Sequence, residues 1–333
     1  MCPWTACEQH GLRTLDASRT TARLRREPVI SARSLGAALF VALLLLLPAL
    51  SLAQGVWTPL VRRLEADGFD RGRMETLFAR PEVRFDPEVM ARKMNALLDV
   101  KIAGPKPPGE APELYLSYLN PFLIMQARSF LEAQRPALRE ARLRYDVPEE
   151  ILVALFLVET KLGRNIGSRS ALTTLASMAL AGDFALVAPL IERRDLSPEL
   201  ALWLRWRTAQ KSAWAYKELK ALLIYAKAAG FDPASIPGSV YGAIGMCQFM
   251  PTNAVRYGAD LDGDGRVDLF RASDALLSTA RFLKANGWAA NLSRERQEAV
   301  LYRYNHSHPY TRTIMAVADR LRDGDSGFSA DGE

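Results

Sequence analysis

The sequence predicts a mainly α-helical protein, and three features of its pattern support that class. Apolar residues recur at helical spacing through 113–145 and 198–229. Residues 151–158 are apolar without interruption, which is typical of a helix buried on every side. No segment alternates apolar and polar residues as a half-buried strand does.

Residues 1–53 have the pattern of an export signal. An apolar run over 35–47 follows Arg33, Pro48 ends the run, and Ser51-Leu52-Ala53 fits the small residues of a cleavage site. We expect cleavage after residue 53. No Cys follows the cut to carry a lipid, so the sequence predicts a periplasmic protein with no lipid anchor. An uncleaved anchor is the alternative, although the run is short for a membrane span.

The rest of the chain is expected to form one domain over 54–323, with a disordered tail over 324–333. Its amino-terminal part, 54–112, ends in a Pro/Gly-rich crossing segment that begins at Lys101, and a helical core fills 113–323. Helices are expected at 57–65, 71–78, 87–98, 172–181, 184–193 and 198–229.

The composition narrows the class of partner. The formal net charge is +6, and half of it lies within residues 1–53. Lys and Arg are not clustered with interleaved aromatic residues, so nucleic acid is not an expected partner, whereas a mildly basic body suits an acidic polymer. Of the three Cys, Cys2 and Cys7 lie in the leader, which leaves Cys247 as a single thiol and predicts no disulfide.

The strongest candidate for chemistry is Glu159, which directly follows the apolar stretch 151–158. The helix is expected to begin at a capping box formed by Asp146 and Glu149. Glu159 falls on the face of that helix that also carries Leu152. It is either a paired structural carboxylate or an acid whose pKa is raised because burial disfavours its charged form.

Three further segments carry polar groups. Residues 238–251 combine glycines with Ser239 and Gln248, whose hydroxyl and amide suit sugar hydroxyl and acetamido groups. Residues 301–310 place Tyr304, Asn305 and Tyr310 around two histidines, and without a third ligand in the pattern they indicate a polar cleft wall rather than a metal site.

The third segment, 260–274, has the D-x-D-x-D-G spacing of the front of an EF-hand loop, in which alternating carboxylates face one cation. Arg271 stands at loop position 12, where an EF-hand has Glu, and Asp274 is the nearby replacement. The sequence therefore predicts a structural calcium ion.

Taken together and in order, four motifs resemble the membrane-bound lytic transglycosylase B family of lytic murein transglycosylases, which carry the transglycosylase SLT domain. The motifs are V-P-x-E-I…V-E-T-x-x-G (147–163), G-S-x-x-G-A-x-G-x-x-Q-F-M-P (238–251), the Asp-rich loop (260–274) and R-Y-N-H-S-x-x-Y (303–310). The resemblance spans roughly 56–320.

The resemblance implies a lysozyme-like fold and cleavage of the β-1,4 bond between N-acetylmuramic acid and N-acetylglucosamine, leaving 1,6-anhydromuramic ends. It implies Glu159 as the single acid/base. The implied substrate-binding residues are Ser239, Gln248, Tyr304, Asn305 and Tyr310. The implied calcium ligands are Asp260, Asp262, Asp264, the Arg266 carbonyl and Asp274.

Glu159 is the one well-placed carboxyl, and no cleft motif offers a second, because the ion would occupy the carboxylates of Asp260–Asp274. This agrees with the implied chemistry, since an ordinary glycosidase usually needs two carboxylates. The alternatives are a muramidase of the lysozyme type and a catalytically silent peptidoglycan-binding protein. The expected partner is the peptidoglycan glycan strand. Proteins of wall synthesis or division are further candidate partners, the chain is expected to be a monomer, and no organic cofactor is expected.

Overall fold

The computed structural model describes residues 55–104 and 113–323. The predicted signal peptide, most of the Pro/Gly-rich crossing segment and the predicted tail lie outside the described residues. The mainly α-helical class is confirmed. Residues 55–66 are helical. The α-helices that follow are α2 (Arg71–Phe78), α3 (Glu88–Ala103), α4 (Pro121–Ala133), α5 (Arg135–Tyr145), α6 (Glu149–Thr160), α7 (Ala171–Leu180), α8 (Pro198–Ala229), α9 (Pro251–Tyr257), α10 (Ala272–Ala285), α11 (Arg294–Tyr304) and α12 (His308–Asp323).

Short elements connect these helices. Four 3-10 turns are found, η1 (Leu116–Leu119), η2 (Phe184–Leu186), η3 (Ala188–Leu190) and η4 (Pro233–Ser235). The described residues form one two-stranded sheet, in which β1 (Arg169–Ser170) pairs antiparallel with β2 (Pro237–Gly238). The sheet joins the segment that follows α6 to the segment that follows α8.

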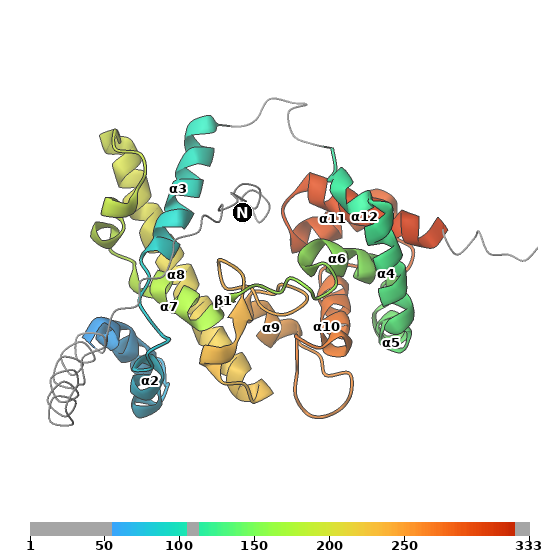
Figure 1. The fold of residues 1–333 in the computed structure, drawn as a ribbon, viewed down its shortest axis with the longest axis horizontal. Helices are drawn as coiled ribbons and strands as arrows, with labels where there is room; N and C mark the ends of the chain where they lie inside the picture. The colour runs from blue at the N-terminus through green and yellow to red at the C-terminus, as the bar shows by residue number, and fades with distance from the viewer. Residues whose placement is uncertain (1–54, 105–112, 324–333) are drawn as a thin grey trace, which may run out of the picture.

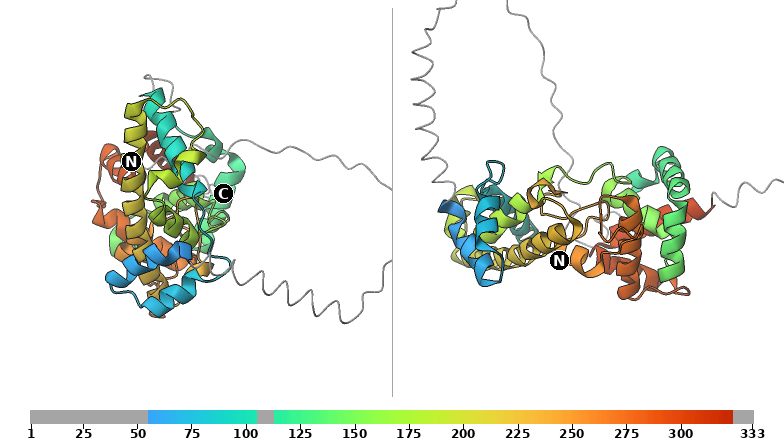
Figure 2. Two further views of the ribbon diagram at one scale, coloured as in Figure 1. Left: turned by 90° about the vertical axis from the view of Figure 1, so that its left-hand side faces the viewer. Right: turned by 90° about the horizontal axis from the view of Figure 1, so that it is seen from below.

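The helices form two groups with the small sheet and α9 between them (Figure 1). One group holds α2, α3, α7 and α8, and the other holds α4, α5, α6, α10, α11 and α12. Helix α9 contacts both α8 and α10, so it links the groups. The right-hand view of Figure 2 shows the same separation along the long axis of the molecule.

Helix α6 is the buried centre of the second group. Every residue from Ile151 to Val158 is buried, as the uninterrupted apolar stretch predicts. Helices α4, α5, α10 and α12 all pack against it. Because the helix buries apolar side chains on all sides, close packing fixes its position. Its C-terminal end lies at the junction between the two groups.

The start of α6 differs from the prediction. Asp146 does not cap this helix; it ends α5 in a left-handed conformation with φ 59°, and its amide donates to the Arg142 carbonyl. Its carboxylate pairs with Lys284 at 2.5 Å. Helix α6 begins at Glu149 with no side-chain cap. Asp146 and Glu149 have the three-residue spacing of a capping box, but they do not form its hydrogen bonds.

Three predicted boundaries also differ. Helix α3 continues to Ala103, because Lys101, Ile102 and Ala103 all favour helix, and it ends at Gly104 with φ 68°. The expected helix over 184–193 is two 3-10 turns, separated at Val187, with Pro189 in the second turn. Residues 113–145 are divided among η1, α4 and α5, with Asn120 and Gln134 as the breaks. The helices 71–78 and 198–229 match the predicted limits.

Within the described ranges, no single helix is both long and apolar enough to cross a membrane; one sharply bent pair, Ala171–Leu180 with Phe184–Leu190, passes that test by length and composition.

Candidate active site

Glu159 lies in the last turn of α6 and is the only residue of that turn whose side chain carries a carboxyl. Its Oε1 accepts a hydrogen bond of 2.6 Å from the Tyr310 hydroxyl in α12. Although the residue is partly exposed, packed atoms surround its carboxyl, and this desolvation raises the pKa of Glu159 to about 7. The bond from Tyr310 acts in the opposite direction and lowers that pKa. Near neutral pH the group is therefore divided between its acid and its carboxylate.

The backbone after Glu159 turns sharply. The φ angles of Lys161, Leu162 and Gly163 are positive, at 50°, 63° and 87°. Residues other than glycine rarely adopt this backbone conformation. The φ angle favours glycine at position 163, and a Cβ there would lie 2.6 Å from the Met246 methyl carbon, so the flexible end of Met246 packs directly on this glycine. The turn brings the end of α6 directly against the segment around residue 246.

Thr160 fastens this turn. Its side chain is fully buried, and Oγ1 donates to the Met246 carbonyl at 3.0 Å. The same oxygen accepts from the Gly163 amide at 3.0 Å. One hydroxyl therefore satisfies a donor of its own turn and an acceptor on a segment 86 residues later.

The glycine-rich segment forms a tight turn beside α6. Ile244 and Phe249 exchange backbone hydrogen bonds of 2.8 and 3.1 Å, which leaves 245–248 as the tip. The chain also packs backbone against backbone here, because a Cβ on Gly167 would lie 2.2 Å from the Gly238 carbonyl oxygen. Close approach of these two segments requires glycine at position 167.

Three residues predicted to bind sugar use polar groups on this backbone. The Ser239 hydroxyl accepts from the amides of Tyr241 and Ala243 at 3.3 and 3.1 Å. The Gln248 amide nitrogen donates to the carbonyls of Gly245 and Ile166 at 3.0 and 3.3 Å, which leaves its carbonyl oxygen.

The third, Tyr304, donates its hydroxyl hydrogen to the Cys247 carbonyl at 2.5 Å. Its ring lies 5.1 Å from that of Phe282 and 5.9 Å from that of Phe249, between ring centroids. Desolvation raises the pKa of the Tyr304 phenol well above its usual value. Tyr304 therefore contacts the turn rather than projecting from it.

Asn305 differs from these three. It follows α11 with only 7% of its surface exposed. Over 55–104 and 113–323 its side-chain amide makes no hydrogen bond. The amide atoms of Asn305 are not among the fully buried polar atoms that lack a partner, so they reach solvent and are available to a polar ligand group. Tyr310, also predicted to bind sugar, instead contacts Glu159 directly.

Other carboxyls with raised pKa values are committed to the backbone. Glu218 in α8 is 4% exposed and accepts from the Thr252 amide and hydroxyl, both at 2.9 Å, which caps the start of α9. Desolvation raises its pKa. Asp274 accepts from the amides of Leu261 and Asp268 at 3.0 and 2.8 Å. Among the described carboxyls with raised pKa values, Glu159 alone has no bond to a backbone amide and keeps an oxygen, Oε2, without a hydrogen bond.

The Asp-rich loop gathers part of the predicted calcium set. Carboxylate oxygens of Asp260, Asp262 and Asp274 lie within 4.8 Å of one another. Twice a calcium–oxygen distance is about 5 Å, so one ion could contact all three groups. Asp264 lies outside this cluster, and its Oδ1 accepts from the Arg266 amide at 2.8 Å.

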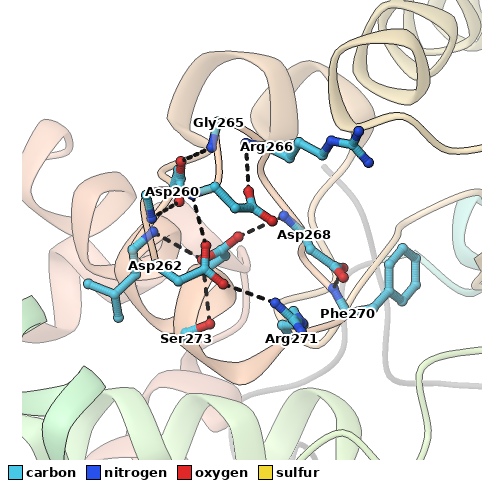
Figure 3. A network of polar contacts seen from close by, with 12 residues as sticks. Asp260, Asp262, Gly265, Arg266, Asp268, Phe270, Arg271 and Ser273 are labelled. Carbon is cyan, nitrogen blue, oxygen red and sulfur yellow. Dashed lines mark hydrogen bonds and ion pairs between the residues drawn. The ribbon is translucent and has the colours of Figure 1, made fainter.

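Backbone amides and one arginine balance the charge of the loop (Figure 3). Asp260 accepts from Gly265 and Gly263 at 2.8 and 2.7 Å, and the Gly265 bond is the main cause that lowers the pKa of Asp260. Arg271 forms an ion pair of 2.9 Å with Asp262. The residue at loop position 12 thus supplies a cation where an EF-hand supplies a ligand. The donor set of three clustered carboxylates fits a calcium ion.

The family model described as the transglycosylase SLT domain matches residues 53–297. The chain belongs to this family. A curated SLT-family relative, the membrane-bound lytic murein transglycosylase B of Escherichia coli (strain K12), is 28% identical over 222 residues, which cover 66% of this chain and 54% of the relative. The chain thus spans about half the length of that relative.

Solved structures of lytic transglycosylases share the fold. The soluble lytic transglycosylase SltB1 from Pseudomonas aeruginosa matches with a TM-score of 0.61 and 21% identity, over 80% of this chain and 98% of that one. The Escherichia coli lytic transglycosylase Slt35 in complex with calcium matches with a TM-score of 0.58 and 20% identity, over 82% and 93% of the two chains. The resemblance inferred from the four motifs is confirmed at the level of the family.

Sequence analysis did not find two buried hydrogen-bonding residues, Thr160 beside Glu159 and Glu218 at the start of α9. Thr160 lies beside Glu159 in the V-E-T motif, and only its 86-residue contact to Met246 reveals its role. Glu218 sits in the middle of α8 among Lys217, Leu219 and Lys220, with no pattern that marks it as buried. The position of Thr160 next to Glu159 is a signal in the sequence that could have identified it. The sequence holds no such signal for Glu218.

Proposed function

We propose that this chain is a peptidoglycan lytic transglycosylase in which Glu159 is the single general acid and base. One observation carries the proposal: Glu159 has a pKa raised to about 7 and an oxygen without a hydrogen bond, while the other described carboxyls with raised pKa values are bound to backbone amides. A group with a pKa near the working pH can both give and take a proton.

The proposed reaction needs no second carboxylate. Glu159, protonated, donates its proton to the glycosidic oxygen as the bond from that oxygen to C1 of the muramyl residue breaks. The hydroxyl at O6 of the same muramyl residue then attacks C1, and its proton passes to the Glu159 carboxylate. A C1–O6 bond has replaced the glycosidic bond, Glu159 is protonated again, and no water has been consumed. The product has a 1,6-anhydromuramic end.

The surrounding residues have distinct parts in this proposal. Tyr310 holds Glu159 through the 2.6 Å bond and stabilises its carboxylate form after proton donation. Asn305 offers an unpaired amide, and the Gln248 carbonyl oxygen is also available, to orient hydroxyl and acetamido groups. Ser239 contributes less directly, because its oxygen already accepts two amides.

We also propose that the loop 260–274 binds calcium as a structural ion. Asp260, Asp262 and Asp274 would hold it, with the Arg266 carbonyl and Asp264 completing the set after small movements of the loop. When bound, the ion would neutralise the clustered carboxylates and link the start of α10 to the end of α9. The relative solved with calcium supports this assignment.

The substrate and location follow from the same proposal. The partner is the peptidoglycan glycan strand, with no organic cofactor, and the enzyme acts in the periplasm as a monomer. The curated relative is named as a murein transglycosylase, which supports that substrate class. Proteins of wall synthesis or division stay candidate partners.

The test is digestion of purified sacculi by residues 54–333, followed by mass spectrometry of the released muropeptides. The proposal expects 1,6-anhydromuramic ends. Reducing ends would identify a muramidase that uses water, and would require a base other than Glu159. Binding to sacculi without any release would identify a silent peptidoglycan-binding protein.

A further inference from the structure

We propose that the hydroxyls of Thr160 and Tyr304 act as a pair that fixes the turn 244–249 against Glu159, so that Tyr304 is a positioning residue and not a ligand of the sugar. The proposal rests on the proposed function only for the role of Glu159. The two hydroxyls come from the end of α6 and the end of α11, on opposite sides of the turn in sequence.

The turn has a defined framework that leaves its tip to be held from outside. Ile244 and Phe249 are paired through both backbone bonds. Gly245 and Gln248 have positive φ angles of 73° and 48°, so the chain reverses within the tip. The Met246 amide is also fixed, because it donates to the Leu269 carbonyl at 2.8 Å.

Three successive carbonyls of the tip are each satisfied by a side chain. The Gly245 carbonyl accepts from the Gln248 amide at 3.0 Å. The next carbonyl, of Met246, accepts from the Thr160 hydroxyl at 3.0 Å, and the next, of Cys247, accepts from the Tyr304 hydroxyl at 2.5 Å. These residues are buried, and a buried carbonyl without a partner costs about 1–3 kcal/mol. The two hydroxyls therefore decide where this backbone lies.

The position of the turn matters because it helps to keep water from Glu159. Thr160, the residue after Glu159, is bonded to the Met246 carbonyl at 3.0 Å, so the tip lies against the end of α6. After desolvation, which is the main cause, the Glu159 charge also contributes to raising the pKa values of Cys247 and Tyr304. Met246 lies over Gly163, directly after the turn that ends α6. If the tip moved outward, water would reach the Glu159 carboxyl, and its charged form would become easier to form.

Tyr304 is also poorly placed as a direct ligand. Its hydroxyl hydrogen is already donated to Cys247, and its ring packs in a cluster with Phe249 and Phe282. Replacing it by Phe would remove the hydroxyl and keep the packing. Thr160→Val likewise keeps the shape and removes the hydroxyl, whereas Thr160→Ser keeps the hydroxyl.

The test is a titration of the Glu159 carboxyl by ¹³C NMR in the full chain, assigned by the signal lost in Glu159→Gln. Tyr304→Phe, Thr160→Val and the double variant are compared with the parent, together with kcat and KM on a soluble glycan fragment. We expect the pKa of Glu159 to fall from about 7 toward its ordinary value, most in the double variant. We expect kcat near neutral pH to fall about tenfold or more with little change in KM.

Two controls remove hydroxyls of the same kind elsewhere. Tyr216→Phe deletes a hydroxyl that lies 2.9 Å from both the Arg63 carbonyl and the Asp67 carboxylate. Ser212→Ala deletes a hydroxyl that donates to the Ala179 carbonyl at 2.7 Å. Both controls should lower the melting temperature and leave the pKa of Glu159 unchanged. Thr160→Ser, which keeps the hydroxyl, should have the same Glu159 pKa as the parent.

A Glu159 pKa that stays at its parent value in both single variants would overturn the proposal. A rise in KM alone for Tyr304→Phe would overturn it too, because it would show that the Tyr304 hydroxyl binds the sugar. The titration does not depend on turnover. A parent chain that releases no muropeptide would therefore refute the proposed function, while the NMR result would still decide the role of this pair. If the double variant does not fold, the single variants decide.

Discussion

Glu159 and Asp260 lie in two different regions of this molecule, and their carboxyls have pKa values shifted in opposite directions. At Glu159, burial is the main influence, and the pKa of the carboxyl rises to about 7. At Asp260, backbone amides dominate, and the pKa of the carboxyl falls below its usual value. Glu159 holds a proton near neutral pH, whereas Asp260 stays ionised. Asp274, which lies beside Asp260, resembles Glu159 in that desolvation raises its pKa, but two backbone amides bind it.

The difference arises from what faces each carboxylate rather than from the residue type. Glu159 has one hydrogen-bond partner, the Tyr310 hydroxyl, and desolvation is the main influence on its pKa. Asp260 has two amides from glycines in its own loop, and Arg271 supplies a nearby cation through Asp262. Amides and cations favour the charged form, whereas desolvation favours the neutral one. The first region suits proton transfer and the second suits a cation.

Glu159→Gln is expected to give the largest effect. Removing the acid should lower the rate of sacculus digestion by about 10²–10⁴-fold, the range for loss of general acid–base catalysis. Glu218→Gln is the matched control, because desolvation raises the pKa of Glu218 as well, but its carboxyl caps α9. It should lower the free energy of unfolding by about 1–3 kcal/mol and leave activity intact. Equal rates for Glu159→Gln and the parent would show that the acid lies elsewhere.

Glu159→Gln should also stabilise the fold at high pH. Because the folded pKa of Glu159 is about 7 and its ordinary value is 4.5, the folded state holds the proton more tightly. Stability is then greatest below the ordinary pKa and is lost as the pH rises through 7, by up to about 3 kcal/mol. Urea unfolding should therefore find Glu159→Gln more stable than the parent at pH 8, with the difference vanishing near pH 4.

Removal of calcium tests the other region. If the loop 260–274 binds the ion, calcium at 100 times its Kd should add about 2.7 kcal/mol to the free energy of unfolding. EDTA should then lower the melting temperature by several degrees, and added calcium should restore it. Asp260→Asn and Asp274→Asn should melt at the same temperature with and without calcium. A parent melt that ignores calcium would contradict a bound ion.

Tyr310→Phe separates the two influences on Glu159. The Tyr310 bond lowers the pKa of Glu159, so its loss should raise that pKa above 7. A hydrogen bond of about 1 kcal/mol predicts a shift of just under one pH unit. The alkaline limb of the rate profile should move upward, because Glu159 keeps its proton to a higher pH. A limb that moves downward, with Tyr216→Phe unchanged, would assign Tyr310 a different role.

Arg271→Gln should give the smallest effect. Its ion pair with Asp262 is exposed, and pairs of that kind contribute about 0–1 kcal/mol. Without calcium the variant should melt slightly lower, because the clustered carboxylates lose a counter-charge. Calcium should bind it up to about fivefold more tightly by calorimetry, because a competing cation is gone. Arg296→Gln, an exposed change of the same net charge, should do neither.

The sequence alone determined the features that depend on neighbours along the chain. An unbroken apolar stretch is typical of a helix buried on every side, so α6 and the place of Glu159 at its end were predicted from residues 151–159. The limits of α8 followed from Ser197, Pro198 and Gly230, which begin and end a helix through local bonds. The four ordered motifs likewise identified the family.

The tertiary structure decided which polar groups meet. Tyr310 and Glu159 lie 151 residues apart, and Tyr304 and Cys247 lie 57 apart, so neither contact leaves a periodic signal. Asp146 had the spacing of a cap but was placed by the end of α5 and by Lys284. Spacing along a helix reports which face a residue occupies, whereas the partner on that face is set by how distant helices pack.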